Sequence, residues 1–298
     1  MPVTPAPSNA NEFIEQQLDA QIEALEDHFK ANGIAINGPL IQGVDNIVRS
    51  VIEERKQEAP DKKRLICILT TDGGYIEVVP RIVDVFRQHY EHVDFIVPDY
   101  AYSAGTVLVM SGDAIWMDYY SRLGPIDPQI GRRGGTLLPA LGYLERYNDL
   151  IRKAAKGKAS MAEVQLLIKG FDQAELFKYE QARELSITLL KEWLVKYKFK
   201  DWKKTKTRKM PVTKGMKTKR ATEIARQLNN TKKWHAHGHG ISRDVLIRDL
   251  RLKIDDFGAD EALNNKIRCY YALQDDYVKK LSNPGIIHAK GNFTPFFY

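Results

Sequence analysis

A nearly all-apolar run at residues 64–69 constrains the fold of this chain more than any other feature of its sequence. A strand that is apolar on both faces is typical of a parallel sheet covered by helices on both sides. Apolar residues then recur at helical spacing over residues 76–90, and an apolar run at residues 93–97 follows as a second strand. The sequence therefore predicts a strand, helix, strand unit and an α/β fold class.

Further elements surround this unit. An amphipathic helix is predicted over residues 14–29, where apolar residues recur every three or four positions. The other predicted elements are helices at residues 44–52, 106–110, 139–156, 160–170, 172–197, 222–228 and 242–250, a strand at residues 114–117 and an irregular aromatic tail at residues 282–298. We accordingly divide the chain into a disordered start and helices (1–58), an α/β core (59–198), a basic linker (199–221) and a helical and irregular C-terminal extension (222–298).

Composition excludes several classes of protein. With 298 residues, 28% charged and 43% hydrophobic, the chain is long and apolar enough to bury a core and is not wholly disordered. Its two cysteines, Cys67 and Cys269, are too few for a disulfide scaffold or a cysteine-built zinc site. No apolar run reaches the roughly 18 to 20 residues of a membrane span, and the proline-rich start lacks the features of an export signal. We expect a cytoplasmic protein without a membrane span.

Two turns carry residues suited to chemistry. Residues 70–75 follow the first strand, and the paired Gly73 and Gly74 allow backbone N–H groups to approach a ligand closely. Residues 99–106 follow the second strand and place Ser103 at the start of a short helix, where free N–H groups face any anion that forms beside the hydroxyl. Each turn also has a plain structural interpretation: an ordinary strand-to-helix turn for the glycines, and a helix cap for the serine.

A third motif, Leu-Gly-Pro-Ile-Asp-Pro-Gln at residues 123–129, follows the two turns. In this order, residues 72–74, 103–106 and 123–129 resemble the motifs of the serine dehydrogenase proteinase family. That family belongs to the superfamily of the Clp protease proteolytic subunit, signal peptide peptidase A and crotonase. The resemblance covers roughly residues 60–200 and continues more weakly to about residue 257. It implies a ClpP/crotonase-like stack of β-β-α units, with additional helices at both ends and a catalytic core over residues 59–198.

The resemblance also implies an activity. It is that of a soluble serine peptidase, which forms an acyl-enzyme with a peptide or protein substrate and uses no cofactor or metal. Carried over by motif, Ser103 is the nucleophile, and the N–H of Gly73 or Gly74 together with that of Ala104 forms the oxyanion hole. Members of the superfamily usually assemble, so a homo-oligomer is expected. Two other interpretations stay open: a catalytically silent assembly or binding module of the same fold, and an acyl-CoA enzyme like crotonase.

The motifs leave the general base open. Signal peptide peptidase A uses a lysine some forty to fifty residues after its serine, and Lys153 lies at 153 − 103 = +50 among apolar neighbours that would bury it. The Clp subunit uses a histidine near the position of Asp127, a carboxylate better suited to orient another group than to deprotonate serine. His237 is an alternative base within the alternating series His235, His237 and His239, a pattern that would also suit a metal or a substrate contact.

Residues 191–220 hold most of the positive charge. They contain thirteen Lys and Arg against Glu192 and Asp201, a local balance of 13 − 2 = +11, whereas the whole chain carries +7. Aromatic residues are interleaved at the front of this block. The plain interpretation is a solvated linker. The functional interpretation is docking to nucleic acid or another anionic surface, in addition to hydrolysis.

Overall fold

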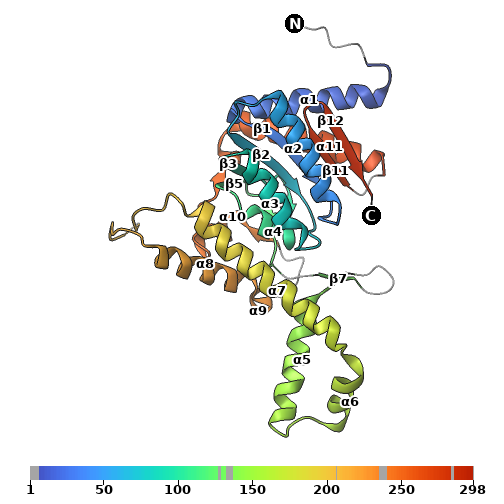
Figure 1. Cartoon of the computed structure of the whole chain (residues 1–298), viewed down its shortest axis with the longest axis vertical. Coiled ribbons are helices and arrows are strands. Elements are labelled where there is room, and N and C mark those ends of the chain that lie inside the picture. Colours follow the sequence, from blue (N-terminus) through green and yellow to red (C-terminus); the bar gives the residue numbers. More distant parts are fainter. Residues whose placement is uncertain are drawn as a thin grey trace.

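The computed structural model describes residues 7–126, 129–131, 137–205, 207–234, 240–282 and 285–297. Its centre is a seven-stranded sheet with the strand order β10-β5-β3-β2-β1-β11-β12 (Figure 1). The parallel strands are β1 (Asn32–Asn37), β2 (Arg64–Thr70), β3 (His92–Ile96), β5 (Ala114–Met117) and β10 (Asp255–Asp256). A hairpin of β11 (Gly285–Ala289) and β12 (Asn292–Phe296) extends the sheet, with β11 antiparallel to β1. The fold class is α/β, as the sequence predicts.

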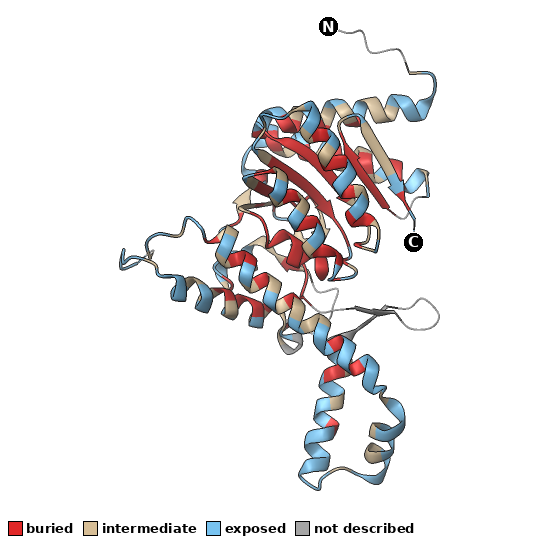
Figure 2. Ribbon diagram, in the orientation of Figure 1, coloured by how far each residue is buried: buried red, intermediate tan, exposed pale blue. Residues whose placement is uncertain are grey.

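Alternate residues of the central strands pack on opposite faces of the sheet, because successive side chains of a strand point to opposite sides. In β2, Leu65, Cys67 and Leu69 belong to one apolar core, and Ile66 and Ile68 belong to the other. All five side chains are at most 2% exposed. This burial on both faces accounts for the apolar run at the centre of the sequence (Figure 2).

Helices cover both faces of the sheet. On one face α1 (Ala10–Phe29) packs against α11 (Glu261–Lys280). On the other face α2 (Val44–Glu58) packs against α3 (Val78–His89), which is followed by the short α4 (Ala104–Val109). The first and last long helices of the chain therefore share one face (Figure 1). Within the described ranges, no helix is both long and apolar enough to cross a membrane.

An arm of helices projects from this α/β core. α5 (Ala140–Ala155) leads away from the sheet, α6 (Met161–Gly170) follows, and the long α7 (Gln173–Trp193) returns (Figure 1). A small apolar cluster of Leu144, Leu176 and Tyr179 holds α5 to α7. A π-helical turn (Leu194–Lys198) then leads towards α8 (Lys214–Leu228), which packs along α7. The remaining short elements are β4 (Tyr100–Ala101), β6 (Arg122–Leu123), β7 (Gln129–Gly131), β8 (Leu137–Pro139), β9 (Ile241–Ser242), α9 (Thr231–Trp234), α10 (Arg243–Arg248) and a 3-10 turn (Phe257–Ala259).

Two predictions about the elements are wrong, and two elements have no counterpart among the predictions. Residues 32–37, for which no element is predicted, form the buried strand β1. The glycine packs closely against α1, because a Cβ on Gly33 would lie 3.0 Å from the Ile22 side chain. The expected irregular tail supplies β11 and β12 to the central sheet, and α8 begins at Lys214, inside the expected linker. Helix α11 has no counterpart among the predictions.

Candidate active site

Ser103 stands at the start of α4 in an unusual backbone conformation. Its φ of 52° and ψ of −118° lie in a region that residues with a side chain rarely adopt. The Ser103 side chain makes no capping hydrogen bond to α4, so the interpretation as an ordinary helix cap is wrong. β4 ends just before the serine, and the chain turns sharply from strand to helix at this residue. Hydrolases present a nucleophilic serine on a strained turn of this kind.

The Asp-Gly-Gly turn directly follows β2. Gly73 and Gly74 have φ values of 100° and 148°, a region that favours glycine. Two backbone hydrogen bonds fasten the turn to Leu40, which donates to the Gly73 oxygen and accepts from the Tyr75 N–H, each at 2.8 Å. A Cβ on Gly74 would lie 2.3 Å from the Leu40 oxygen. The turn therefore needs glycine for its conformation and for its close approach to the neighbouring backbone.

The glycine turn and the serine turn meet. Thr71 joins them through its backbone, because its N–H donates to the Tyr100 oxygen at 3.1 Å and its oxygen accepts the Tyr102 N–H at 2.9 Å. A Cβ built on Gly73 would lie 2.7 Å from the Ser103 Cβ and 3.2 Å from the Ala104 nitrogen. The glycine backbone and the first amide of α4 thus lie together beside the serine.

The amide hydrogens of the two turns differ in their availability. The Gly73 N–H donates to Oγ1 of Thr71 at 3.0 Å, and the Gly105 N–H donates to the Tyr102 oxygen at 2.8 Å. No acceptor among the described residues takes the N–H of Gly74 or of Ala104. The described part of the chain therefore leaves these two amides available to a ligand.

Thr106 attaches the loop after β6 to the serine turn. Its side chain is fully buried, donates to the Ala101 oxygen at 2.8 Å and accepts the Gly124 N–H at 2.9 Å. Farther along the loop, Nδ2 of Asn229, at the end of α8, donates to the Ile126 oxygen at 3.1 Å. The loop is therefore held from two sides, by the serine helix and by α8.

Sequence reasoning missed the positioning roles of Thr71 and Thr106. Both residues lie inside the motifs, but a threonine hydroxyl in a sequence gives no sign of which backbone group it will bond. The only sign of these roles in the sequence is that Thr71 and Thr106 lie in or beside the glycine turn and the serine turn. The partners of the two hydroxyls lie 2, 5 and 18 residues away along the chain, and the fold decides which of them each hydroxyl meets.

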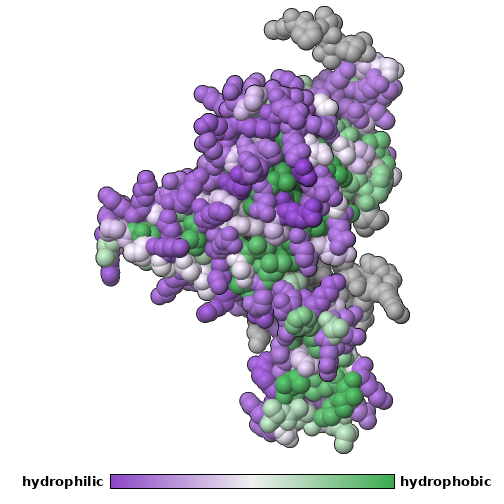
Figure 3. Space-filling model, in the orientation of Figure 1, coloured by the Kyte–Doolittle hydropathy of each residue, from purple (hydrophilic) through white to green (hydrophobic). Residues whose placement is uncertain are grey.

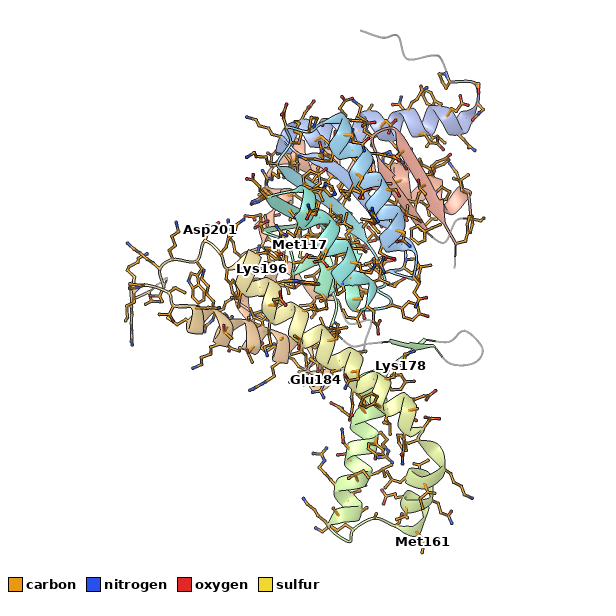
Figure 4. All side chains as sticks on the ribbon, in the orientation of Figure 1. Met117, Met161, Lys178, Glu184, Lys196 and Asp201 are labelled. Atoms are coloured by element: carbon orange, nitrogen blue, oxygen red, sulfur yellow. The ribbon has the colours of Figure 1, made fainter. Side chains whose placement is uncertain are left out.

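Lys153 lies on the exposed arm. It occupies the last turn of α5, and its Nζ forms an ion pair of 2.8 Å with Glu163 near the start of α6. Met161, the first residue of α6, marks the far end of the arm in Figure 4. The Lys153 side chain is 47% exposed and its neighbour Ile151 is 42% exposed, so the expected burial is absent. Within one chain the structure does not bring Lys153 to Ser103.

Asp127 and His237, with the rest of the histidine segment at residues 235–239, lie outside the described residues. The chain resumes at Gly240 and pairs as β9 with β6, which pairs with β4 in a three-stranded sheet. The segment after the histidines therefore shares a sheet with the strand that leads into Ser103. Elsewhere in the described ranges, no three His, Cys, Asp or Glu side chains are grouped as a metal site requires.

A cavity of about 350 Å³ lies between α5, α7 and α8. Arg183, Arg226 and Asn229 are among the residues that line it. Asn229 connects the cavity to the loop after β6, because its side chain accepts from Nε of Arg183 at 2.9 Å and donates to the Ile126 oxygen. The cavity is thus next to the loop that Thr106 ties to the serine turn.

The structure divides the basic block into a packed part and an exposed part. Lys200 pairs with the buried Asp113, and Nζ of Lys198 donates to the Asp113 oxygen at 3.3 Å. Burial lowers the pKa of Lys198 to about 8. The described residues of the segment 203–214 instead form an exposed hairpin on the side of the molecule, which ends at the first residue of α8 (Figure 3). The solvated-linker interpretation is therefore wrong for the front of the block.

Comparison with known families assigns the chain. Residues 39–210, more than half of its length, match the ClpP-like SDH-type serine proteinases. The chain belongs to this family. The match covers both turns, Ser103 and the arm, and it agrees with the resemblance seen in the motifs. The family is one of serine proteinases, and its fold is ClpP-like.

Two curated relatives match part of the chain. Two uncharacterized proteins of Methanocaldococcus jannaschii, MJ0137 and MJ1495, are each 29% identical to it, over 161 and 145 residues. The matches cover 49% and 48% of this chain and 50% and 45% of theirs, so the chain spans about half the length of the curated relatives it matches.

Solved structures of the 1510-N membrane-bound stomatin-specific protease are similar over part of the chain. One, a mutant in complex with a substrate peptide, has a TM-score of 0.43 at 16% identity and covers 74% of this chain and 72% of its own. A second mutant has a TM-score of 0.31 at 19% identity and covers 49% and 73%. The family assignment rests on the sequence match and not on these alignments.

Proposed function

We propose that this protein is a serine peptidase that cleaves a peptide or protein through an acyl-enzyme at Ser103. The observation that carries the proposal is the meeting of the two turns, where Gly73 packs against Ser103 and the Ala104 amide lies beside them. The positive φ of Ser103 supports the same role, since a structural cap normally has an extended conformation.

The proposed reaction proceeds in two halves. A general base takes the proton of the Ser103 hydroxyl while Oγ bonds to the carbonyl carbon of the substrate. The tetrahedral intermediate then collapses, the C–N bond breaks, and the proton passes from the base to the leaving amine. Water attacks the acyl-enzyme in the same way, and its proton returns to Ser103 Oγ as the new carboxyl group leaves.

The N–H groups of Gly74 and Ala104 are proposed as the oxyanion hole. Negative charge develops on the carbonyl oxygen in both halves of the reaction, and donors that are already in place stabilise it without reorganisation. One such donor is worth about 2.7 to 4 kcal/mol of transition-state stabilisation. Gly73 is the less suitable donor, because its N–H is already bonded to Thr71.

We favour His237 over Lys153 as the general base within one chain. The strand that follows the histidine segment lies in the same small sheet as β4, whereas Lys153 is exposed and paired with Glu163. Imidazole also titrates in the range that a general base needs. Asp127 keeps its proposed role of orienting another group. Lys153 stays a candidate as a residue supplied by the arm of a second copy.

The arm supports the proposal of a homo-oligomer. Met161, Ile168 and Phe177 are 75%, 74% and 64% exposed, and hydrophobic residues gather at the end of the arm in Figure 3. Exposed apolar clusters of this kind are typical of protein interfaces. We propose the cytoplasm as the location, since Cys67 and Cys269 are both free thiols.

Labelling with a fluorophosphonate probe tests the proposed function. Mass spectrometry should find one adduct, on Ser103, and Ser103→Ala should abolish it. Ser50→Ala, which alters an exposed serine of α2, should label normally. A folded protein that takes no adduct in any form would be a catalytically silent module. Tight binding of a coenzyme A thioester without serine labelling would favour the acyl-CoA alternative.

A further inference from the structure

We propose that the basic hairpin, residues 203–214, docks this protein to a membrane surface rich in anionic phospholipids. The hairpin carries six Lys and Arg residues and no Asp or Glu. It connects the end of the π-helical turn to α8 and projects from the side of the molecule (Figures 1 and 3). The proposed peptidase chemistry does not use it, so the proposal stands independently of that chemistry.

The basic hairpin has a defined shape. The Thr205 N–H donates to the Met210 oxygen at 2.9 Å, and the Met210 N–H donates to Oγ1 of Thr205 at 3.0 Å. Lys204 and Pro211 form a β-bridge across its two sides. A preformed hairpin loses less conformational entropy than a flexible linker when it meets a surface.

Both ends of the basic hairpin are fastened to the folded core. Before it, Phe199 is buried and its ring lies 5.7 Å from that of Trp202, while Lys200 pairs with the buried Asp113. After it, Nζ of Lys217 in α8 donates to the Lys200 oxygen at 2.9 Å. A surface that holds the hairpin would therefore also orient the whole protein.

The cations of the basic hairpin are not neutralised within the chain. Lys203, Lys204, Arg208, Lys209 and Lys214 are exposed, and none forms an ion pair with a carboxylate of the described ranges. Charges of one sign gathered on a projecting element attract a surface of opposite sign. Each Lys or Arg near an anionic leaflet adds to this attraction.

Two observations favour a lipid surface over nucleic acid. Most aromatic side chains before the hairpin are engaged within the protein: Trp193 and Phe199 are 5% and 9% exposed, and the Tyr197 ring lies 3.7 Å beneath the Arg87 guanidinium. Trp202 is half-buried and packs on Phe199. Met210, by contrast, is 55% exposed at the turn of the hairpin. An apolar side chain among lysines suits the boundary between headgroups and acyl chains.

Sedimentation with lipid vesicles tests the proposal on the full chain. We expect binding to vesicles of phosphatidylcholine mixed with phosphatidylglycerol, and none to phosphatidylcholine alone. Binding should weaken with salt, because the Debye length falls from about 10 Å at 0.1 M to about 3 Å at 1 M. Replacing Lys203, Lys204, Arg208 and Lys209 by Gln should lower the partition coefficient about fivefold per cation, and several hundredfold together.

A matched variant distinguishes the effect of the hairpin cations from the effect of the net charge of the protein. Replacing Lys156, Lys158, Lys169 and Lys178 by Gln removes the same charge from exposed positions on the arm (Figure 4 labels Lys178). This variant should bind mixed vesicles nearly as well as the unaltered protein, and both variants should keep the same circular dichroism and thermal unfolding. Equal losses in the two variants, or no loss in the hairpin variant, would overturn the proposal.

A second substitution distinguishes lipid from nucleic acid. Met210→Ser should weaken vesicle binding severalfold and leave any binding to duplex DNA unchanged, because only the lipid surface accepts the apolar side chain. The lipid proposal is overturned if duplex DNA binds more tightly than mixed vesicles at the same salt and Met210→Ser affects neither. That outcome would assign the hairpin to nucleic acid.

Discussion

Gly73 packs directly against Ser103, so closely that a Cβ on Gly73 would lie 2.7 Å from the Ser103 Cβ. The same Cβ would lie 2.8 Å from the Tyr102 oxygen, and both distances are shorter than real Cβ atoms tolerate. The φ of 100° at Gly73 adds a conformational reason for glycine. The serine turn and the glycine turn can therefore lie together only while this residue has no side chain.

Gly73→Ala should reduce fluorophosphonate labelling of Ser103 about a hundredfold or more, because the two turns must separate and the oxyanion donors move with them. The rate of labelling measures the loss. Gly142→Ala is the control, since nothing lies within 4 Å of a Cβ there, and it should label at the normal rate. Full labelling of folded Gly73→Ala would contradict the proposed geometry.

Thr71 should act as a positioning residue for the glycine turn. Thr71→Val removes the acceptor of the Gly73 N–H and should lower kcat about tenfold with little change in KM. Thr71→Ser keeps the hydroxyl but removes the methyl group that faces Gly105, and should retain most of kcat. Steady-state kinetics with a peptide substrate checks both. If the two variants lose the same fraction of their activity, and this loss follows their loss of folding stability, Thr71 is merely structural.

The choice of base predicts different results for two substitutions. With His237 as the base, His237→Ala should lower the labelling rate about a hundredfold or more. Lys153→Met should then label normally, and the exposed His28→Ala serves as the control. If Lys153→Met is the inactive variant, mixing it with Ser103→Ala should restore part of the activity, because the arm of one copy would serve the serine of another.

Asp113 should contribute stability that depends on pH. Burial alone would raise the pKa of Asp113, but hydrogen bonds from Lys200, the Val93 N–H and Arg87 outweigh it and lower the pKa. A lowered folded-state pKa means that the stabilisation is present above the unfolded value, near 3.9, and is lost as the pH falls through the folded value.

Asp113→Asn should therefore reduce the free energy of unfolding by about 3 kcal/mol at pH 7, and the difference should shrink in acid. Urea unfolding at several pH values measures both effects. Asp149→Asn breaks an exposed pair with Arg152 and should cost less than about 1 kcal/mol. A difference that stays constant down to pH 3 would show that Asp113 does not act through its charge.

Local sequence patterns predicted those helices and strands that can be recognised from a few consecutive residues. β2 and β3 are apolar on both faces and α3 repeats its apolar residues at helical spacing, so each could be recognised alone. β1 contains an Asn-Gly pair that normally marks a turn, and only its packing against α1 explains the glycine. β11 and β12 extend the sheet because β11 pairs with β1 and β12 pairs with β11. A local sequence pattern does not show that β1 has an unpaired side to which they can add.

By itself, the sequence determined the α/β class and the residues that carry the proposed chemistry, because a strand buried on both faces, a glycine pair and a serine before a helix are local properties. Only the tertiary structure decided that Gly74 rather than Gly73 has an available N–H, and that Lys153 stands on an exposed arm. The first fact depends on where the Thr71 hydroxyl points once Thr71 has joined the serine turn, and the second on how α5 and α6 project from the core. Packing energy, and not local propensity, selects such arrangements.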